Sequence, residues 1–180
     1  MSTIKCLAGA ALAIAAGFLA GCSSGAQRES ALHADYQMGE RVTIGPLTYN
    51  VVETVWRNQL GDGFKIRLPV NRFMLVTLSV TNGGGKEISV PMMELVNEKG
   101  ETVKESDDGE NVDEWIGIIR TISPAQTLQG RIVFDAPLSS YRLRVTDGSD
   151  AASDRYSYVQ IPLRIDADAP VQAPLPGTAK

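Results

Sequence analysis

Few side chains in this chain of 180 residues are suited to covalent or metal chemistry. Its two cysteines are Cys6 and Cys22, and its one histidine is His33. A Ser-His-Asp or Cys-His site needs a histidine held within the fold, and His33 precedes the segments that show strand-like alternation. A zinc site needs further histidine or thiolate ligands. The residue types therefore argue against an enzyme and predict neither a cofactor nor a metal.

A run of acidic residues is the strongest local anomaly, formed by Glu105, Asp107, Asp108, Glu110, Asp113 and Glu114. Carboxylate oxygens suit calcium, but an EF-hand loop with Gly109 at its sixth position would begin at Lys104 and end at Trp115 instead of glutamate. Glycoside hydrolysis needs two carboxyl groups at a defined distance. Asp107 and Glu114 are an example of such a pair, but nothing in the sequence fixes the distance between them.

Three interpretations of this run stay open: a solvated acidic loop, a weak calcium site, and a loop that binds a partner. Trp115 supports the third, because an aromatic side chain beside charges is costly to expose without a use. The candidate interaction residues are Asp107, Asp108, Asp113, Glu114 and Trp115. In the competing interpretation, Trp115 belongs to the core.

The N-terminus combines Lys5 with an uncharged apolar run from Leu7 to Ala20, about 14 residues. A spanning helix needs roughly 20 residues, so this run has the length of a signal-peptide core. Leu19, Ala20 and Gly21 then precede Cys22, and these four residues resemble the lipobox of bacterial lipoproteins. The resemblance implies cleavage before Cys22, diacylation of its sulfur and acylation of the new amine. Such chains anchor a protein stably, because each buried methylene contributes about 0.8 kcal/mol.

By this resemblance residues 1–21 are the signal peptide, and Ser23 favours delivery to the outer membrane in bacteria that have one. Loss of Lys5 leaves 16 of the 17 basic residues against 21 acidic residues, a net charge of −5. An acidic domain with few aromatic residues is a poor nucleic-acid binder. We expect a tether over 22–35, one folded domain over 36–166 and a Pro/Ala-rich tail over 167–180.

Strand-like alternation dominates the expected domain and is clearest over 74–81. Further strands are expected around 47–51, 128–134, 142–145 and 156–165, with a hairpin joining 95–96 to 102–103. Pro162 favours an edge position for the last strand. Asn82-Gly83-Gly84-Gly85 predicts a hairpin turn, because these residues tolerate positive φ. Arg142 and Arg144 share the outer face of their strand, where we expect water around them.

The segment 112–119 is ambiguous. The spacing of Val112, Trp115, Ile116 and Ile119 fits one face of a helix, whereas Gly117 and the β-branched isoleucines favour a strand. The remaining segments are short, β-rich and separated by turn residues. They predict an all-β fold, an antiparallel, immunoglobulin-like β-sandwich.

Several motifs follow one another along the chain: Gly39-Glu40-Arg41-Val42-Thr43-Ile44-Gly45-Pro46-Leu47-Thr48-Tyr49, Val80-Thr81-Asn82, Leu95-Val96-Asn97-Glu98-Lys99-Gly100 and Val133-Phe134-Asp135-Ala136-Pro137. Together they resemble domain of unknown function 4352, which is common on bacterial lipoproteins and secreted proteins, over about Met38 to Val145. The resemblance implies an immunoglobulin-like fold of the secreted-antigen type and transfers no catalytic residue. Pro124-Ala125 stands where the family often has Pro-Gly.

These observations predict a lipid-anchored, non-catalytic interaction or scaffolding module of the bacterial cell envelope. Its partners would be the membrane, through the N-terminal lipid, and an envelope protein. It would lie on the outer membrane where the organism has one, and otherwise on the outer face of the cell membrane. A lipoprotein that binds a small ligand or a cation is the alternative, and an envelope enzyme is the weaker one.

Lipid attachment at Cys22 leads to the first testable prediction. The full-length protein should partition into detergent and incorporate labelled fatty acid, and Cys22→Ala should lose both properties because the acylated sulfur is gone. Cys6→Ala is the matched control, since this residue leaves with the signal peptide. Wild-type protein that stays in the aqueous phase would contradict the lipobox assignment.

Overall fold

The computed structural model describes residues 34–61, 65–110, 112–149 and 155–164. Within these ranges every regular element is a strand, and no helix is long and apolar enough to cross a membrane. The strands are β1 (Asp35–Gln37), β2 (Arg41–Ile44), β3 (Leu47–Arg57), β4 (Phe73–Asn82), β5 (Ile88–Ser89), β6 (Glu94–Asn97), β7 (Thr102–Lys104), β8 (Thr121–Ile122), β9 (Thr127–Asp135), β10 (Tyr141–Thr146) and β11 (Tyr156–Ile161).

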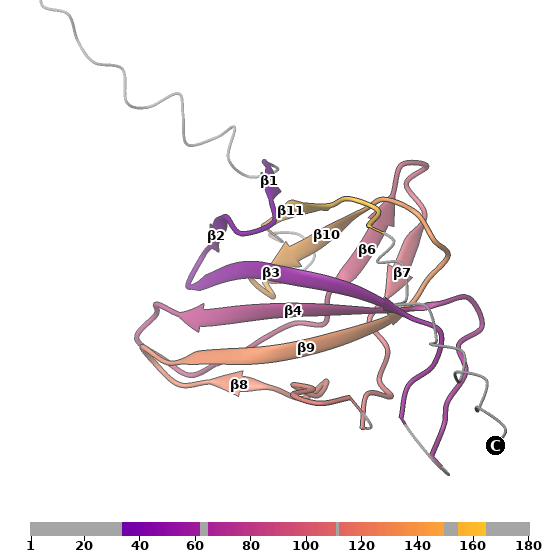
Figure 1. The fold of residues 1–180 in the computed structure, drawn as a ribbon. Coiled ribbons are helices and arrows are strands. Elements are labelled where there is room, and N and C mark those ends of the chain that lie inside the picture. The colour runs from indigo at the N-terminus through magenta and orange to yellow at the C-terminus, as the bar shows by residue number, and fades with distance from the viewer. Residues whose placement is uncertain (1–33, 62–64, 111, 150–154, 165–180) are drawn as a thin grey trace, which may run out of the picture.

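The strands form two facing layers (Figure 1). One sheet has the order β1-β11-β10-β6-β7 and the other has the order β2-β3-β4-β9, while β5 and β8 form a separate pair. The predicted all-β sandwich is confirmed. All pairings are antiparallel in the described chain except that of β1, which runs parallel to β11.

The core lies between the two sheets and follows from the period of two along each strand. Alternate residues of β4 (Met74, Val76, Leu78, Val80) face Leu143, Val145 and Val159 across it, and all of these are buried. The fully buried Tyr49 of β3 crosses this core, and its hydroxyl donates a 2.7 Å hydrogen bond to the carbonyl oxygen of Thr146. Burial raises the pKa of the Tyr49 hydroxyl, so it stays a neutral donor that joins the two sheets.

The predicted hairpin is confirmed, because β6 and β7 pair and Gly100 between them has φ 81°. The predicted edge position of the last strand is wrong. β11 lies between β10 and β1, and it ends at Ile161, one residue before Pro162. The short β1 therefore occupies the edge that Pro162 suggested for β11. β1 begins at Asp35, the last residue assigned to the tether.

The glycine run after β4 is not a hairpin turn, and none of its three glycines has a positive φ. The chain leads instead into β5, which pairs with β8. The fully buried Asn82 organises this turn: its side-chain amide donates to the carbonyl oxygens of Lys86 and Ile122, and its Oδ1 accepts from the Gly84 amide. Gly84 lies in a tight place, because a Cβ there would lie 3.0 Å from the Cβ of Pro46.

Arg142 and Arg144 are half-buried and are not simply solvated. Their guanidinium carbons lie 4.4 Å and 4.5 Å from the ring centres of Tyr158 and Tyr156, respectively. Arg144 also approaches a carboxylate oxygen of Glu94 at 3.5 Å. Because arginine stacks on aromatic faces, these side chains cover the outer face of the five-stranded sheet.

Glu105 and Arg120 form an ion pair whose side chains are 0% and 2% exposed. The two guanidinium nitrogens donate at 2.6 Å and 2.8 Å to the two carboxylate oxygens. The Met93 amide also donates to Glu105, and Arg120 also donates to the carbonyl oxygens of Pro91 and Gly117. The expectation that Glu105 belongs to a solvated acidic run is therefore wrong.

This pair yields the second prediction. Arg120→Met should lower the free energy of unfolding by about 3–5 kcal/mol, because it leaves a buried carboxylate without a counter-charge. The double variant Glu105→Met, Arg120→Met should lose less than the sum of the two single variants. Chemical denaturation of the four proteins measures this coupling, and strictly additive losses would show that the two groups act independently.

Candidate functional site

The segment 105–120 lies along the open edge of β9, and its backbone forms part of the sheet's hydrogen bonding. The Ser106 amide donates to the Val133 carbonyl at 2.7 Å, and the Ile116 amide donates to the Arg131 carbonyl at 3.1 Å. The ambiguity over 112–119 is resolved as neither helix nor strand, because only a single parallel bridge, from Trp115 to Arg131, forms there. The segment covers an edge that would otherwise be free to pair.

Gly130 allows this close approach. Its φ is 156°, and a Cβ at this position would lie 2.2 Å from the carbonyl oxygen of Glu114. That oxygen instead accepts a 2.8 Å hydrogen bond from the Arg131 amide, while Glu114 itself has a φ of 61°. A non-glycine residue in this conformation is uncommon, so the local geometry is imposed by the contact with β9.

Trp115 is half-buried and is not the fully exposed anchor that the sequence suggested. It packs on a second apolar cluster, on the outer face of the β2-β3-β4-β9 sheet, formed by Leu60, Phe73, Leu75, Val112 and Val133. Its indole Nε1 is buried without a hydrogen-bond partner, and a Cβ on Gly109 would lie 2.4 Å from this atom. Trp115 therefore joins the acidic loop to the sheet.

The acidic candidates point in different directions. Asp107, Asp113 and Glu114 are exposed, whereas Asp108 forms an ion pair with Arg67 of the connection between β3 and β4. The guanidinium of Arg67 also lies 5.0 Å from the ring centre of Phe73. No group of three potential metal ligands occurs among the described residues. The loop is thus tied to the β3–β4 connection through Asp108.

That connection carries a feature that sequence reasoning missed. Ile66, Leu68 and Val70 are 50%, 72% and 92% exposed, and we call them the apolar ridge. Their backbone is held: Arg67 and Leu60 exchange two 2.9 Å hydrogen bonds, and the Asp135 carboxylate accepts from the amides of Val70 and Asn71. The sequence signal for the ridge is the alternation of apolar residues over 66–70. Pro69 in this segment argues against a strand, so the alternation did not lead to a prediction.

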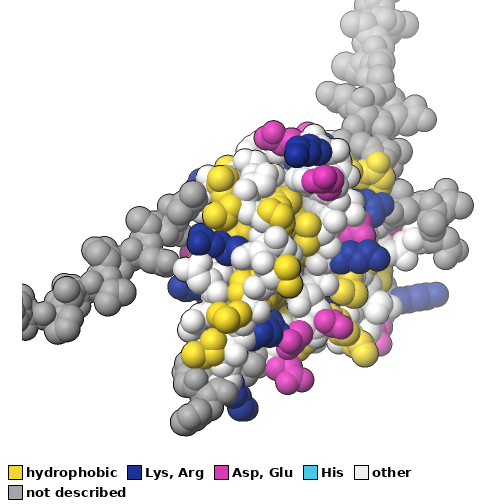
Figure 2. Space-filling view, turned by 90° about the vertical axis from the view of Figure 1, so that its right-hand side faces the viewer, with side chains coloured by type: hydrophobic (Ala, Val, Ile, Leu, Met, Phe, Trp, Pro, Cys, Tyr) yellow, Lys and Arg dark blue, Asp and Glu magenta, His cyan; other side chains and the backbone are white. Residues whose placement is uncertain are grey.

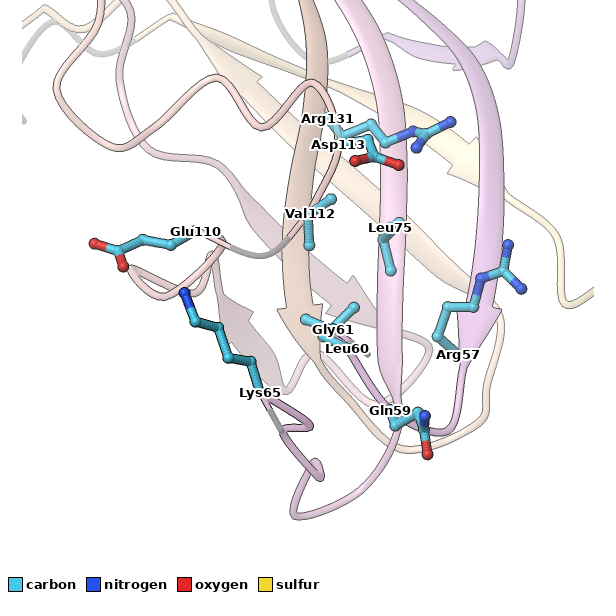
Figure 3. Close-up of a pocket in the computed structure, with 10 residues that line it drawn as sticks. All are labelled: Arg57, Gln59, Leu60, Gly61, Lys65, Leu75, Glu110, Val112, Asp113 and Arg131. Atoms are coloured by element: carbon cyan, nitrogen blue, oxygen red, sulfur yellow. The ribbon is translucent and has the colours of Figure 1, made fainter. Parts of the chain in front are cut away.

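A hollow of about 550 Å³ lies beside this connection, on the outer face of β3, β4 and β9 (Figure 3). Buried Leu60, Leu75 and Val112 contribute its apolar lining. Its polar lining consists of Arg57, Gln59, Lys65, Glu110, Asp113 and Arg131. Of the candidate interaction residues predicted from the sequence, only Asp113 lines the hollow. The basic residues of the lining come from separate elements, so no local sequence motif indicated them.

The residues predicted to carry lipid, Leu19, Ala20, Gly21 and Cys22, lie outside the described ranges, as does His33. The same holds for most of the tether over 22–35 and for the tail over 167–180. The lipid anchor and these two flanks stay predictions from the sequence.

The family model of the domain of unknown function DUF4352 matches residues 36–155. The chain belongs to this family. The match spans the first strands, the Asn82 turn and the segment that covers β9. No curated protein matches the chain in sequence.

Solved structures extend the likeness to the fold. MPT63, a secreted protein of Mycobacterium tuberculosis, is 15% identical with a TM-score of 0.53, and the match covers 71% of this chain and 97% of that one. YjhA of Bacillus subtilis is 15% identical with a TM-score of 0.52, over 69% and 98%. YcdA, a candidate lipoprotein of the same species, is 14% identical with a TM-score of 0.53, over 70% of this chain and 39% of YcdA. At these identities the likeness concerns the fold alone.

The packing of Trp115 yields the third prediction. Trp115→Ala should lower the free energy of unfolding by about 2 kcal/mol, because the second cluster loses a half-buried aromatic contact. Trp115→Phe is the matched control and should lose less. In a Trp56→Phe background, the emission of Trp115 should be blue-shifted and should move to the red on unfolding. Emission at the wavelength of a solvated indole in the native protein would contradict this packing.

Proposed function

We propose that this protein is a lipid-anchored, non-catalytic interaction module of the bacterial envelope, located on the outer membrane where the organism has one. Cys22 and the residues before it support the anchor. The apolar ridge supports the interaction role, and it is the observation on which this proposal rests. Both cysteines and the histidine lie outside the described sandwich, which leaves it without the usual nucleophile–base pairs.

The apolar ridge supports a binding role because contacts of the neighbouring backbone hold its side chains in an exposed position. Arg67 turns its guanidinium toward Phe73, so the neighbouring Ile66 and Leu68 project the other way. The Leu60 bridge and the Asp135 carboxylate hold this backbone on both sides of the ridge. Apolar residues that are exposed together in one place mark interaction surfaces more often than singly exposed ones do. Figure 2 views this side, and hydrophobic side chains (yellow) form several patches there between charged ones.

The charges around the ridge favour a protein partner over a lipid surface. Asp108 pairs with Arg67 directly beneath the ridge, and Asp107 and Glu110 are exposed in the same loop. Anionic headgroups would repel these carboxylates. A protein with an apolar groove and a basic rim would complement both the ridge and the loop, with the rim charges mainly increasing the association rate.

The fourth prediction tests this surface in intact cells of the source organism. A photo-crosslinking residue at position 68 of the full-length protein should give a discrete protein adduct, because Leu68 would lie inside the interface. The matched control is position 52, since Val52 is also an exposed aliphatic residue, at 57%, but lies on β3. It should give no such adduct.

A second variant separates binding from folding. Ile66→Ser, Leu68→Ser and Val70→Ser together should keep the melting temperature, since these side chains are exposed, and should abolish the adduct formed from a crosslinker at Asn71, an exposed residue that directly follows Val70. Adducts with lipid only, or equal adducts at positions 52 and 68, would contradict a protein interface at the ridge.

A further inference from the structure

The hollow beside the ridge combines an apolar floor with basic groups from three parts of the chain. Arg57 lies at the end of β3, Arg131 lies on β9, and Lys65 lies on the β3–β4 connection. Leu75 of β4 lies between the two arginine-bearing strands and is 8% exposed. The fold thus brings cations and aliphatic surface together at one concave place.

The register explains how the two arginines come to flank Leu75. Arg57 pairs with Phe73, and Arg131 pairs with Thr77, so they lie one step to either side of Leu75 along β4 on the same sheet face. Their strands are two inter-strand spacings apart, about 10 Å, and their partners on β4 lie four residues apart, about 13 Å along the strand, so the two backbone positions are roughly 16 Å apart. Two long side chains can close that distance around a small group. In Figure 3 both guanidinium groups extend to the same side of Leu75.

These basic side chains form no ion pair among the residues that the structure describes, although two carboxylates line the same hollow. Arg67, Arg120, Arg142, Arg144 and Arg155 all form ion pairs there, whereas Arg57, Lys65 and Arg131 form none. Glu110 and Asp113 also line the hollow, but neither lies within ion-pair distance of these three. An anion that entered the hollow would therefore not have to displace an existing ion pair.

The apolar floor of the hollow adds a requirement for the bound group beyond its negative charge. Leu60, Leu75 and Val112 are 5%, 8% and 8% exposed, so each presents a small part of its aliphatic side chain to the entering group. Inorganic phosphate would satisfy the guanidinium groups but would leave this surface in contact with water. An anion that carries an aliphatic chain satisfies both, and guanidinium groups bind carboxylate and phosphate through paired hydrogen bonds.

We propose that this hollow is a binding site for a small amphiphilic anion, with its acid group between Arg57 and Arg131 and its aliphatic part on Leu60, Leu75 and Val112. The site goes beyond the proposed interaction module, because it uses different side chains from the apolar ridge. Carboxylate and phosphate monoester are the acid groups that this chemistry accepts. The proposal requires no covalent step.

The test is a titration of the isotope-labelled full-length protein with three probes of equal chain length, followed by NMR. Hexanoate and hexyl phosphate represent the two acid groups, and hexanol represents the aliphatic chain alone. At least one anion should shift the Leu60, Leu75 and Val112 methyl signals in a saturable manner, and hexanol should bind at least tenfold more weakly. A response to hexanoate alone assigns the site to carboxylates, and a response to hexyl phosphate alone assigns it to phosphate monoesters.

Variants distinguish this site from general surface binding. Arg131→Gln should weaken the binding of the responding anion about tenfold, the loss expected for one charge-assisted hydrogen bond. Arg41→Gln is the matched control, because Arg41 is an exposed arginine on β2 outside the hollow. It should leave binding unchanged, and both variants should keep the wild-type melting temperature.

The proposal is overturned if hexanol shifts the same methyl groups as strongly as the anions, if neither anion gives a saturable shift, or if Arg41→Gln and Arg131→Gln weaken binding equally. A failure here leaves the crosslinking result at position 68 unaffected, because Leu68 does not line the hollow.

Discussion

The buried pair of Glu105 and Arg120 is the interaction on which the arrangement of one whole side of the molecule depends. It lies where the chain leaves β7, and it connects that point to the strand β8 and to the backbone around Pro91 and Met93. A buried ion pair adds little net stability compared with an apolar pair, since both charges lose water. Its effect is on specificity, because no other described side chain satisfies both groups. Because the ion pair holds Glu105 and Arg120 together, the segment between them forms a closed loop. This loop lies along β9.

The loop closed by this ion pair affects the neighbouring sheet through backbone hydrogen bonds. The closed loop donates to Val133 and Arg131, which covers the edge of β9, and Trp115 completes the cluster on the outer sheet face. Buried Asn82 plays a comparable part for the turn that leads into β5, because it donates to the carbonyl oxygens of Lys86 and of Ile122 in β8. Three polar side chains in otherwise apolar surroundings thus determine where the long connections go, whereas the apolar residues determine only that the sheets pack.

The sheets could be predicted from the sequence because alternation is a local signal. Met74 to Thr81 needs no distant partner to reveal which side chains face inward, and the same holds for Leu143 and Val145. Glu105 could not be recognised as buried, because its counter-charge lies 15 residues away and Glu105 itself occurs in a polar stretch. The prediction for the glycine run after Asn82 failed for a related reason: Gly84 lies close to Pro46, and none of the three glycines has a positive φ. The basic lining of the hollow depends on register between strands that are distant in sequence.

The bridge between Leu60 and Arg67 gives the two proposed binding surfaces, the apolar ridge and the hollow, a common base. Leu60 supplies floor to the hollow through its side chain, and its backbone holds Arg67, whose neighbours form the ridge. Arg67 in turn reaches Asp108 and so contacts the loop that the ion pair has closed. A shift of Leu60 in the hollow would therefore move the bridge and, with it, the residues on either side. Any energetic coupling between the hollow and the ridge has to be reciprocal, so a partner on the ridge would change the affinity of the hollow by the same factor.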